Sequence, residues 1–238
     1  MPSHPLLKPG VTHNEVPRMK RLVKAHLVKQ GQGTLANSIN EVSMVYGENA
    51  VKGVKAVQKK HSLVVDGIVG SKTWAVLETV STSFQLVMVS RDSWGARTSK
   101  EVEHTTWTAG TPIRVHHTVN DDISNTLDAE KAAMRAIQNY HMNTKGWNDI
   151  AYNYIIFKSG RVYVGRGRNV VGAHTKDHND DCGIAFYGDY TKTTMTYKQV
   201  QAFRAIKSKL GLTGKNIPHS ATFNTSCPSK EIINKLGL

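Results

Sequence analysis

A loop near the C-terminal end of the chain, residues 216–231, brings a histidine and a cysteine close together. His219 and Cys227 are separated by seven residues in NIPHSATFNTSCPSKE. Imidazole nitrogen and thiolate sulfur are ligand types that zinc favours. Two ligands cannot hold a catalytic zinc, which takes three protein ligands and keeps a fourth position open. The fold must therefore bring a third ligand to this loop from a distant segment.

The strongest source of that ligand is the apolar run TPIRVHHTVN, far upstream, which contains His116 and His117. Neighbouring side chains of an extended segment point to opposite faces, so only one of the two can face the loop directly. The other is expected behind the ligand or at the surface. From spacing alone, a core histidine and a buried free cysteine remain the ordinary alternative.

The length of 238 residues allows one large domain or a small plus a medium one. No apolar run approaches the roughly 18 to 20 residues that cross a bilayer. The first twenty residues lack an uninterrupted apolar region, so we expect no secretory signal peptide. Without secretion the two cysteines are expected as reduced thiols, with Cys227 as a ligand and Cys182 buried and inert.

The chain is basic throughout, with a formal net charge of +13. Residues 1–80 hold 11 Lys+Arg and 5 Asp+Glu (+6), which leaves 20 and 13 (+7) for the remainder. This charge suits a polyanionic partner such as nucleic acid, anionic lipid or a cell-wall polymer, and plain solubility explains it equally well. No nucleic-acid recognition signature is present, so we expect no nucleic-acid partner.

Residues 1–80 are predicted to form a small all-α, three-helix domain, followed by a linker at 81–86. Apolar residues at helical spacing predict a helix over 16–29 and a second helix that begins near Ala50. Between them GQGTLANSIN (31–40) is expected to be a connector. Asp66-Gly67 predicts a turn, and Ser71 is expected to cap a short helix.

Within this first domain, residues 50–77 contain Val57-Gln58, DGIVG (66–70) and Thr73-Trp74. This pattern resembles the three-helix peptidoglycan-binding module found on many cell-wall hydrolases. The resemblance implies bacterial peptidoglycan as a partner. These residues mostly build the fold of the module, so they identify it without marking its binding surface.

Residues 87–238 are predicted to be an α/β domain with a central mixed β-sheet flanked by helices. The helix over 128–143 is expected to carry acidic residues in its first turn and an apolar face formed by Ala132, Ala133, Ala136, Ile137 and Tyr140. Trp94 is expected to pack on the core. The expected strands are 112–118, 150–157, 161–166 and 183–188, and the other helices begin near Thr196, which has a capping-box pattern, and Ser229.

Residues 88–238 also contain a series of short motifs. They are SRDSWGA (90–96), VHHT (115–118), GWNDIAYNYII (146–156), VGAHTKDHN (171–179) and PHSATFNTSCP (218–228). In this order the motifs resemble those of the zinc-dependent N-acetylmuramoyl-L-alanine amidases related to peptidoglycan recognition proteins and phage amidase lysins. In that pattern the first histidine of the pair is a zinc ligand, which implies His116, and His219 and Cys227 match the other two.

The same resemblance assigns further roles. Tyr152 matches the active-site tyrosine of the family, whose phenol would hydrogen-bond a developing oxyanion. Thr225 matches a catalytic position that the family fills with lysine or threonine, and a neutral hydroxyl there leaves the electrostatic part of the mechanism open. The residues expected to contact substrate are His117, Trp147 and His174, of which His174 has loop hydrogen bonding as its alternative.

The function implied is cleavage of the amide between N-acetylmuramic acid and L-alanine with Zn²⁺ as cofactor. The layout and charge favour a monomeric phage endolysin that is stored in the host cytoplasm and released through a holin. The alternative is a non-catalytic peptidoglycan-binding protein on the same fold, although such relatives typically lack the metal cysteine, which this chain keeps. A muramidase is disfavoured because no acidic pair stands out.

Overall fold

The computed structural model describes residues 4–80 and 84–238. The chain divides into two compact units, Met1–Ser83 and Phe84–Leu238. Part of the predicted linker, residues 81–83, lies outside the described residues, whereas Phe84 and Leu86 pack against the core of the second unit. Among the described residues, no helix combines the length and apolar character that a membrane span requires.

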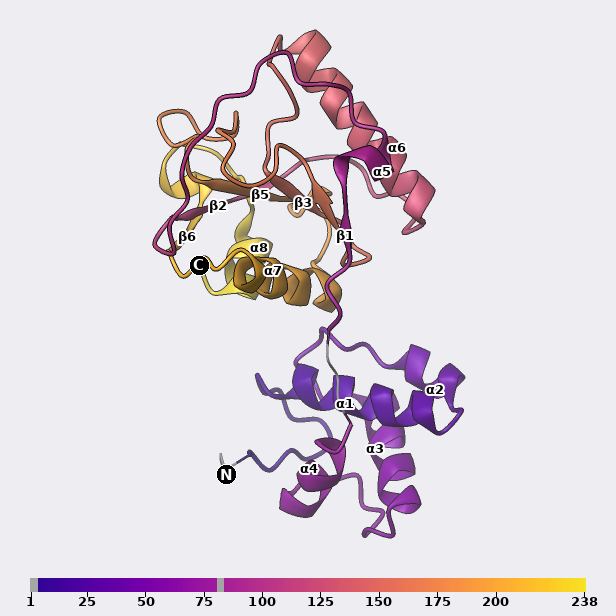
Figure 1. Ribbon diagram of the computed structural model, residues 1–238. Coiled ribbons are helices and arrows are strands. Elements are labelled where there is room, and N and C mark those ends of the chain that lie inside the picture. Colours follow the sequence, from indigo (N-terminus) through magenta and orange to yellow (C-terminus); the bar gives the residue numbers. More distant parts are fainter. Residues whose placement is uncertain (1–3, 81–83) are drawn as a thin grey trace. The chain divides into compact units, whose positions relative to one another are not determined.

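The first unit is helical, as predicted. The connector between α1 and α3 contains a short additional helix, α2, in which the N–H of the buried Ala36 donates to the Gln32 carbonyl at 3.0 Å. Gly70 occupies the cap position of α4 and Ser71 is its first residue, so the expectation that Ser71 caps the helix is wrong. The four helices described here are α1 (Val16–Lys29), α2 (Gly33–Ser38), α3 (Glu48–Lys60) and α4 (Ser71–Leu77), all visible in Figure 1.

A buried polar network joins α3 to the turn that precedes α4. The Gln58 side chain donates to Asp66 Oδ1 and to the Ile68 carbonyl, both at 2.9 Å, and accepts from the Gly67 N–H at 2.9 Å. Gly67 has φ +77°, a conformation that glycine adopts readily. The predicted Asp66-Gly67 turn is therefore present, and every polar atom of Gln58 has a partner.

The second unit is built on one mixed six-stranded sheet, as predicted. The strands lie in the order β1-β4-β3-β5-β2-β6, and all neighbours are parallel except the β3–β4 hairpin. The strands are β1 (Met88–Val89), β2 (Ile113–His117), β3 (Tyr154–Ile156), β4 (Val162–Val164), β5 (Cys182–Phe186) and β6 (Asn216–Pro218).

Helices cover both faces of this sheet (Figure 1). The short α5 (Arg91–Trp94) and α6 (Leu127–Asn139) lie on one face, and α7 (Tyr197–Lys209) and α8 (Lys230–Leu236) lie on the other. The capping box at Thr196 is present, and the Ser229 side chain caps α8. Trp94 is fully buried, as expected for a residue that packs on the core.

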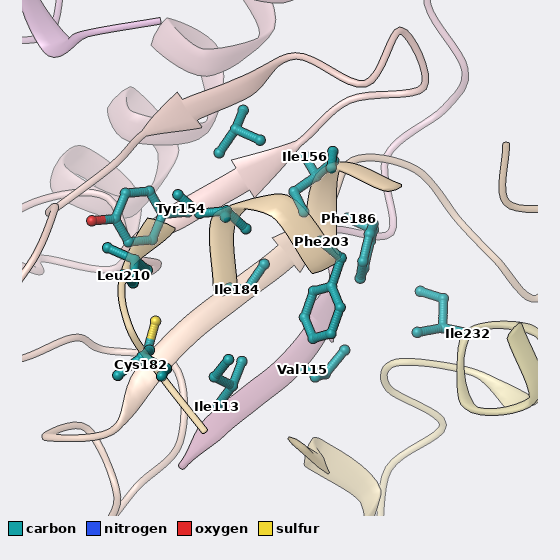
Figure 2. Packing of buried hydrophobic residues seen from close by; sticks show 14 of the residues in the cluster. Ile113, Val115, Tyr154, Ile156, Cys182, Ile184, Phe186, Phe203, Leu210 and Ile232 are labelled. Carbon is teal, nitrogen blue, oxygen red and sulfur yellow. The ribbon is translucent and has the colours of Figure 1, made fainter. Parts of the chain in front are cut away.

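Alternation along β2 separates the apolar core from the polar site. Ile113 and Val115 pack with residues of β5 and α7 on one face of the sheet, as Figure 2 shows. Side chains of a strand alternate between faces, so Arg114 and His116 point to the opposite face. The same alternation buries the Cys182 thiol in the apolar core, where burial raises its pKa, in agreement with an inert cysteine.

Two sequence predictions about the second unit need correction. Helix α6 ends at Asn139 and continues as a π-helical turn, η1 (Tyr140–Thr144). Of the predicted apolar face, Ile137 is buried as expected, whereas Ala132, Ala136 and Tyr140 are exposed. The other buried residues of α6 are Met134, Gln138 and Glu130, and Glu130 is paired with Arg161. The strand expected over 150–157 is limited to β3 (Tyr154–Ile156), and the buried Asn153 side chain just before it donates to the carbonyls of Gly167 and Val170 and accepts from the Gly183 N–H of β5.

Candidate metal centre

Three ligand-type side chains converge at one end of the sheet. His116 from β2, His219 from the 3-10 turn η2 (His219–Ala221), and Cys227 have ligand atoms that all lie within 4.8 Å of one another. The Sγ of Cys227 lies 3.7 Å from His116 Nδ1. The two histidines meet because β6 pairs with β2 up to Val115 and Pro218, and His116 and His219 are the residues that directly follow this last pair.

The loop that carries His219 and Cys227 is held by main-chain and side-chain contacts. The Ser220 N–H donates to the Cys227 carbonyl at 2.8 Å, and the His117 N–H donates to Cys227 Sγ at 3.4 Å. Arg114, on the same face of β2 as His116, donates to Thr222 at 2.8 Å and pairs with Asp181 at 2.7 Å. These contacts tie the loop to the strand that carries the third ligand.

The protonation states favour a bound cation. Burial lowers the pKa of His116 well below its ordinary value and lowers that of His219 as well, so both rings are neutral near pH 7 with a lone pair available. Burial raises the pKa of the Cys227 thiol to about 11, against a smaller lowering effect of the His117 N–H. A thiolate at this position therefore requires a positive charge beside it.

Tyr152 and Thr225 lie beside this centre. The ring of Tyr152 is 5.4 Å from that of His116, and burial raises the pKa of the phenol, which therefore keeps its hydrogen for donation. Tyr152 precedes β3 and is not part of it. The Thr225 hydroxyl accepts from the Cys227 N–H at 3.2 Å, so it braces the ligand loop.

The three residues expected to contact substrate differ in their position relative to the metal centre. His117 points away from the centre. Its side chain is 3% exposed and its Nδ1 accepts from the Tyr190 N–H at 3.3 Å, so a substrate contact by this side chain is not supported. The reason is the alternation of β2, which sends adjacent side chains to opposite faces. Trp147 is half-exposed, and His174 is buried beside His116 with ring centres 5.2 Å apart.

A groove runs next to the centre on the same unit. One cavity of about 490 Å³ is lined by Trp147, His174, His219 and Phe223, among others. A second cavity of about 750 Å³ shares Trp147 and Ala173 with the first and also contains Arg166. The two cavities are neighbours, since Trp147 and Ala173 line both, and the smaller one reaches the centre at His219.

Comparison with known families identifies both units. The family model of the N-acetylmuramoyl-L-alanine amidases matches residues 107–230, and a model described as a peptidoglycan binding domain matches residues 21–77. The chain belongs to the N-acetylmuramoyl-L-alanine amidase family. Cleavage of the amide between N-acetylmuramic acid and L-alanine is the activity that follows from this membership.

Individual relatives include peptidoglycan-recognition proteins and an amidase. Peptidoglycan-recognition protein SC2 of Drosophila melanogaster is 32% identical over 169 residues, which cover 68% of this chain and 91% of the relative. The N-acetylmuramoyl-L-alanine amidase of Sus scrofa is 36% identical over 136 residues, or 52% of this chain and 22% of the relative. Drosophila PGRP-LB, a solved structure, superposes with a TM-score of 0.60 at 29% identity and covers 64% of this chain and 94% of that one.

Sequence reasoning missed several residues that shape the amidase site. Thr175 lies 3.2 Å from His116 Nε2, and Arg114 ties down the ligand loop. His141, in η1, accepts from the Ala151 N–H at 3.1 Å and packs on Trp147 with ring centres 5.0 Å apart. The only signal for Thr175 was its place directly after His174 in the matched motif.

Proposed function

We propose that this amidase is zinc-dependent, with His116, His219 and Cys227 as the ligands. The observation that supports this most strongly is the separation of 3.7 Å between Cys227 Sγ and His116 Nδ1. A tetrahedral zinc with bonds of about 2.3 Å to sulfur and about 2.0–2.1 Å to nitrogen sets these atoms about 3.6 Å apart. Two neutral imidazoles and a thiol also form the soft donor set that zinc prefers.

Zinc bound there supplies a Lewis acid and lowers the pKa of water. The residues of this chain have separate tasks around it. Tyr152 retains its hydrogen and is placed to donate to the oxygen of the amide carbonyl. Trp147 offers a half-exposed aromatic face along the groove. Thr225 braces the loop of Cys227 through its main-chain N–H, which leaves no cation at the position that other family members fill with lysine.

Digestion of purified peptidoglycan tests this proposal. We expect new L-alanine amino termini and no new reducing sugar ends, loss of the reaction after treatment with a chelator, and recovery on addition of Zn²⁺. Digestion that continues at full rate in a chelator, with the metal content verified as absent, would contradict zinc dependence. Binding to peptidoglycan without any new amino termini would favour the alternative of a non-catalytic recognition protein.

The partner proposed for the first unit is also peptidoglycan, supported by its match to the peptidoglycan binding domain. For the second unit, which is the one long enough for the match, a mutant of Drosophila PGRP-LB was determined in complex with tracheal cytotoxin, at 30% identity and a TM-score of 0.57. The monomeric state and a phage endolysin role, with storage in the host cytoplasm and release through a holin, stay predictions. Lysis of host cells that co-express a holin, compared with cells that lack it, tests that role.

A further inference from the structure

Behind the metal centre, a buried threonine bridges two histidine rings. His116 directs Nδ1 toward Cys227, whereas its Nε2 lies 3.2 Å from Thr175 Oγ1. The same oxygen lies 3.1 Å from His174 Nδ1. Thr175 is 1% exposed, so solvent is excluded from the bridge. One hydroxyl therefore has to satisfy two imidazoles.

The direction of these hydrogen bonds follows from the metal end of the bridge. Nδ1 of His116 faces Cys227 and needs a free lone pair to be a ligand, so the hydrogen of the neutral ring belongs on Nε2. The Nε2–H of His116 then donates to Thr175 Oγ1. The hydrogen of the Thr175 hydroxyl is left for His174 Nδ1, which is then an acceptor.

A hydroxyl donates a single hydrogen. If Thr175 donates to His174 Nδ1, its lone pair must accept from His116 Nε2–H. His116 then carries its hydrogen on Nε2, and Nδ1 keeps a lone pair that points toward Cys227. This is the tautomer that a metal at the centre requires, because a protonated Nδ1 cannot be a ligand.

The surrounding residues hold this bridge rigidly. The Asn179 side chain accepts from the N–H groups of His174 and Thr175, at 2.7 and 2.9 Å. The ring of His174 lies directly against Gly172 and Gly183, where an added Cβ would fall 2.3 and 2.2 Å from the ring Cδ2. Both positions must therefore lack a side chain for the ring to fit. Such packing keeps a supporting residue in one orientation.

We propose that Thr175 is a positioning residue that selects the Nε2–H tautomer of His116, with His174 as the anchor of the bridge. His174 accordingly acts from behind the ligand and does not use its nitrogens on substrate. This inference rests on the proposed zinc site. It also makes a statement about the metal-free protein, because the bridge consists only of side chains of this chain.

Two measurements test the proposal. Long-range ¹H–¹⁵N spectra of the full-length, metal-free protein show which nitrogen of each ring carries hydrogen, and we expect Nε2 for both His116 and His174. Competition with a chromophoric chelator gives the affinity for Zn²⁺. We expect Thr175→Val to weaken zinc binding about 10- to 100-fold, the range typical for loss of such a partner. Thr175→Ser keeps the hydroxyl and should retain most of the affinity.

A hydrogen on Nδ1 of His116 in the wild-type spectrum would overturn the proposal, and so would a Thr175→Val variant that folds and binds Zn²⁺ as tightly as the wild type. The wild-type spectrum decides the matter even if Thr175→Val fails to fold. Failure of the wild-type protein to bind Zn²⁺ would instead count against the proposed function, while the tautomer of His116 would still support or refute the bridge.

Discussion

Both units bury polar side chains. In the first unit these side chains hydrogen-bond within the protein, whereas in the second unit they converge on a candidate metal site. In the first unit, Gln58 donates and accepts within a closed network, and no polar atom of it lacks a partner. In the second unit, His116, His219 and Cys227 direct acceptor atoms at one another within 4.8 Å. A closed network stabilises one fold. Converging acceptors are costly to bury unless a cation joins them, so they indicate a binding function.

The largest expected effect comes from removing one of the converging acceptors. Cys227→Ser should reduce hydrolysis of peptidoglycan to background and release bound zinc, because a hydroxyl is a much poorer zinc ligand than a thiolate. Circular dichroism should show an unchanged fold, since Cys227 is only partly buried. Cys182→Ala is the control for the cysteine content, with activity retained, because it removes the other thiol without burying a hydroxyl in the apolar core. Near-normal lysis by Cys227→Ser would refute the zinc assignment.

Opening the closed network should affect stability instead of catalysis. Gln58→Met keeps the size of the side chain but leaves Gly67 N–H and the Ile68 carbonyl without their partner. We expect a loss of about 2–3 kcal/mol in the free energy of unfolding of the first unit, measured by denaturant titration. Gln32→Met, at an exposed position, should change it by less than about 0.5 kcal/mol. Equal effects of the two variants would contradict the role of the network.

His141 is intermediate between the closed network of Gln58 and the converging ligands of the metal centre. Its ring is buried, and its Nδ1 accepts a hydrogen bond from the Ala151 N–H. Burial lowers its pKa to about 4, below the ordinary value of 6.5. Between these two pKa values the unfolded chain binds a proton at His141 that the folded chain does not. The free energy of unfolding therefore increases with pH in this window, and the contribution of His141 is lost as the pH falls. We expect a contribution of about 1–3 kcal/mol.

The variant His141→Asn isolates this contribution, since its oxygen can still accept from the Ala151 N–H. Denaturant titrations of wild type and variant at several pH values between 4 and 7 give the measurement. The wild type should lose more stability than the variant over this range. Parallel curves for the two proteins would mean that His141 does not titrate in the unfolding reaction.

The smallest effect is expected for a polar pair that faces solvent. Lys52 and Glu48 form an ion pair on the exposed side of α3, 2.7 Å apart. Lys52→Ala should lower the free energy of unfolding by no more than about 0.5 kcal/mol, because solvent screens exposed pairs. A loss comparable to that of Gln58→Met would show that burial does not distinguish the two interactions.

Local patterns in the sequence predicted much of the fold. Helical spacing located α1 with its observed bounds, and the capping box located the start of α7. The reason is that hydrophobic periodicity and caps act over a few neighbouring residues. The apolar face of α6 was predicted less well, because small alanines can lie on either side and the buried Glu130 is paired with Arg161 and accepts from the Tyr163 hydroxyl.

The identities of the ligand candidates and their chemistry followed from the sequence alone, through the residue types and the motifs around His116, His219 and Cys227. Only the tertiary structure decided which nitrogen of His116 faces the centre, that His117 turns away, and that Thr175 and Arg114 brace the site. Those relations join residues far apart in the chain. They depend on strand register and on the space left by glycines, which local sequence patterns do not encode.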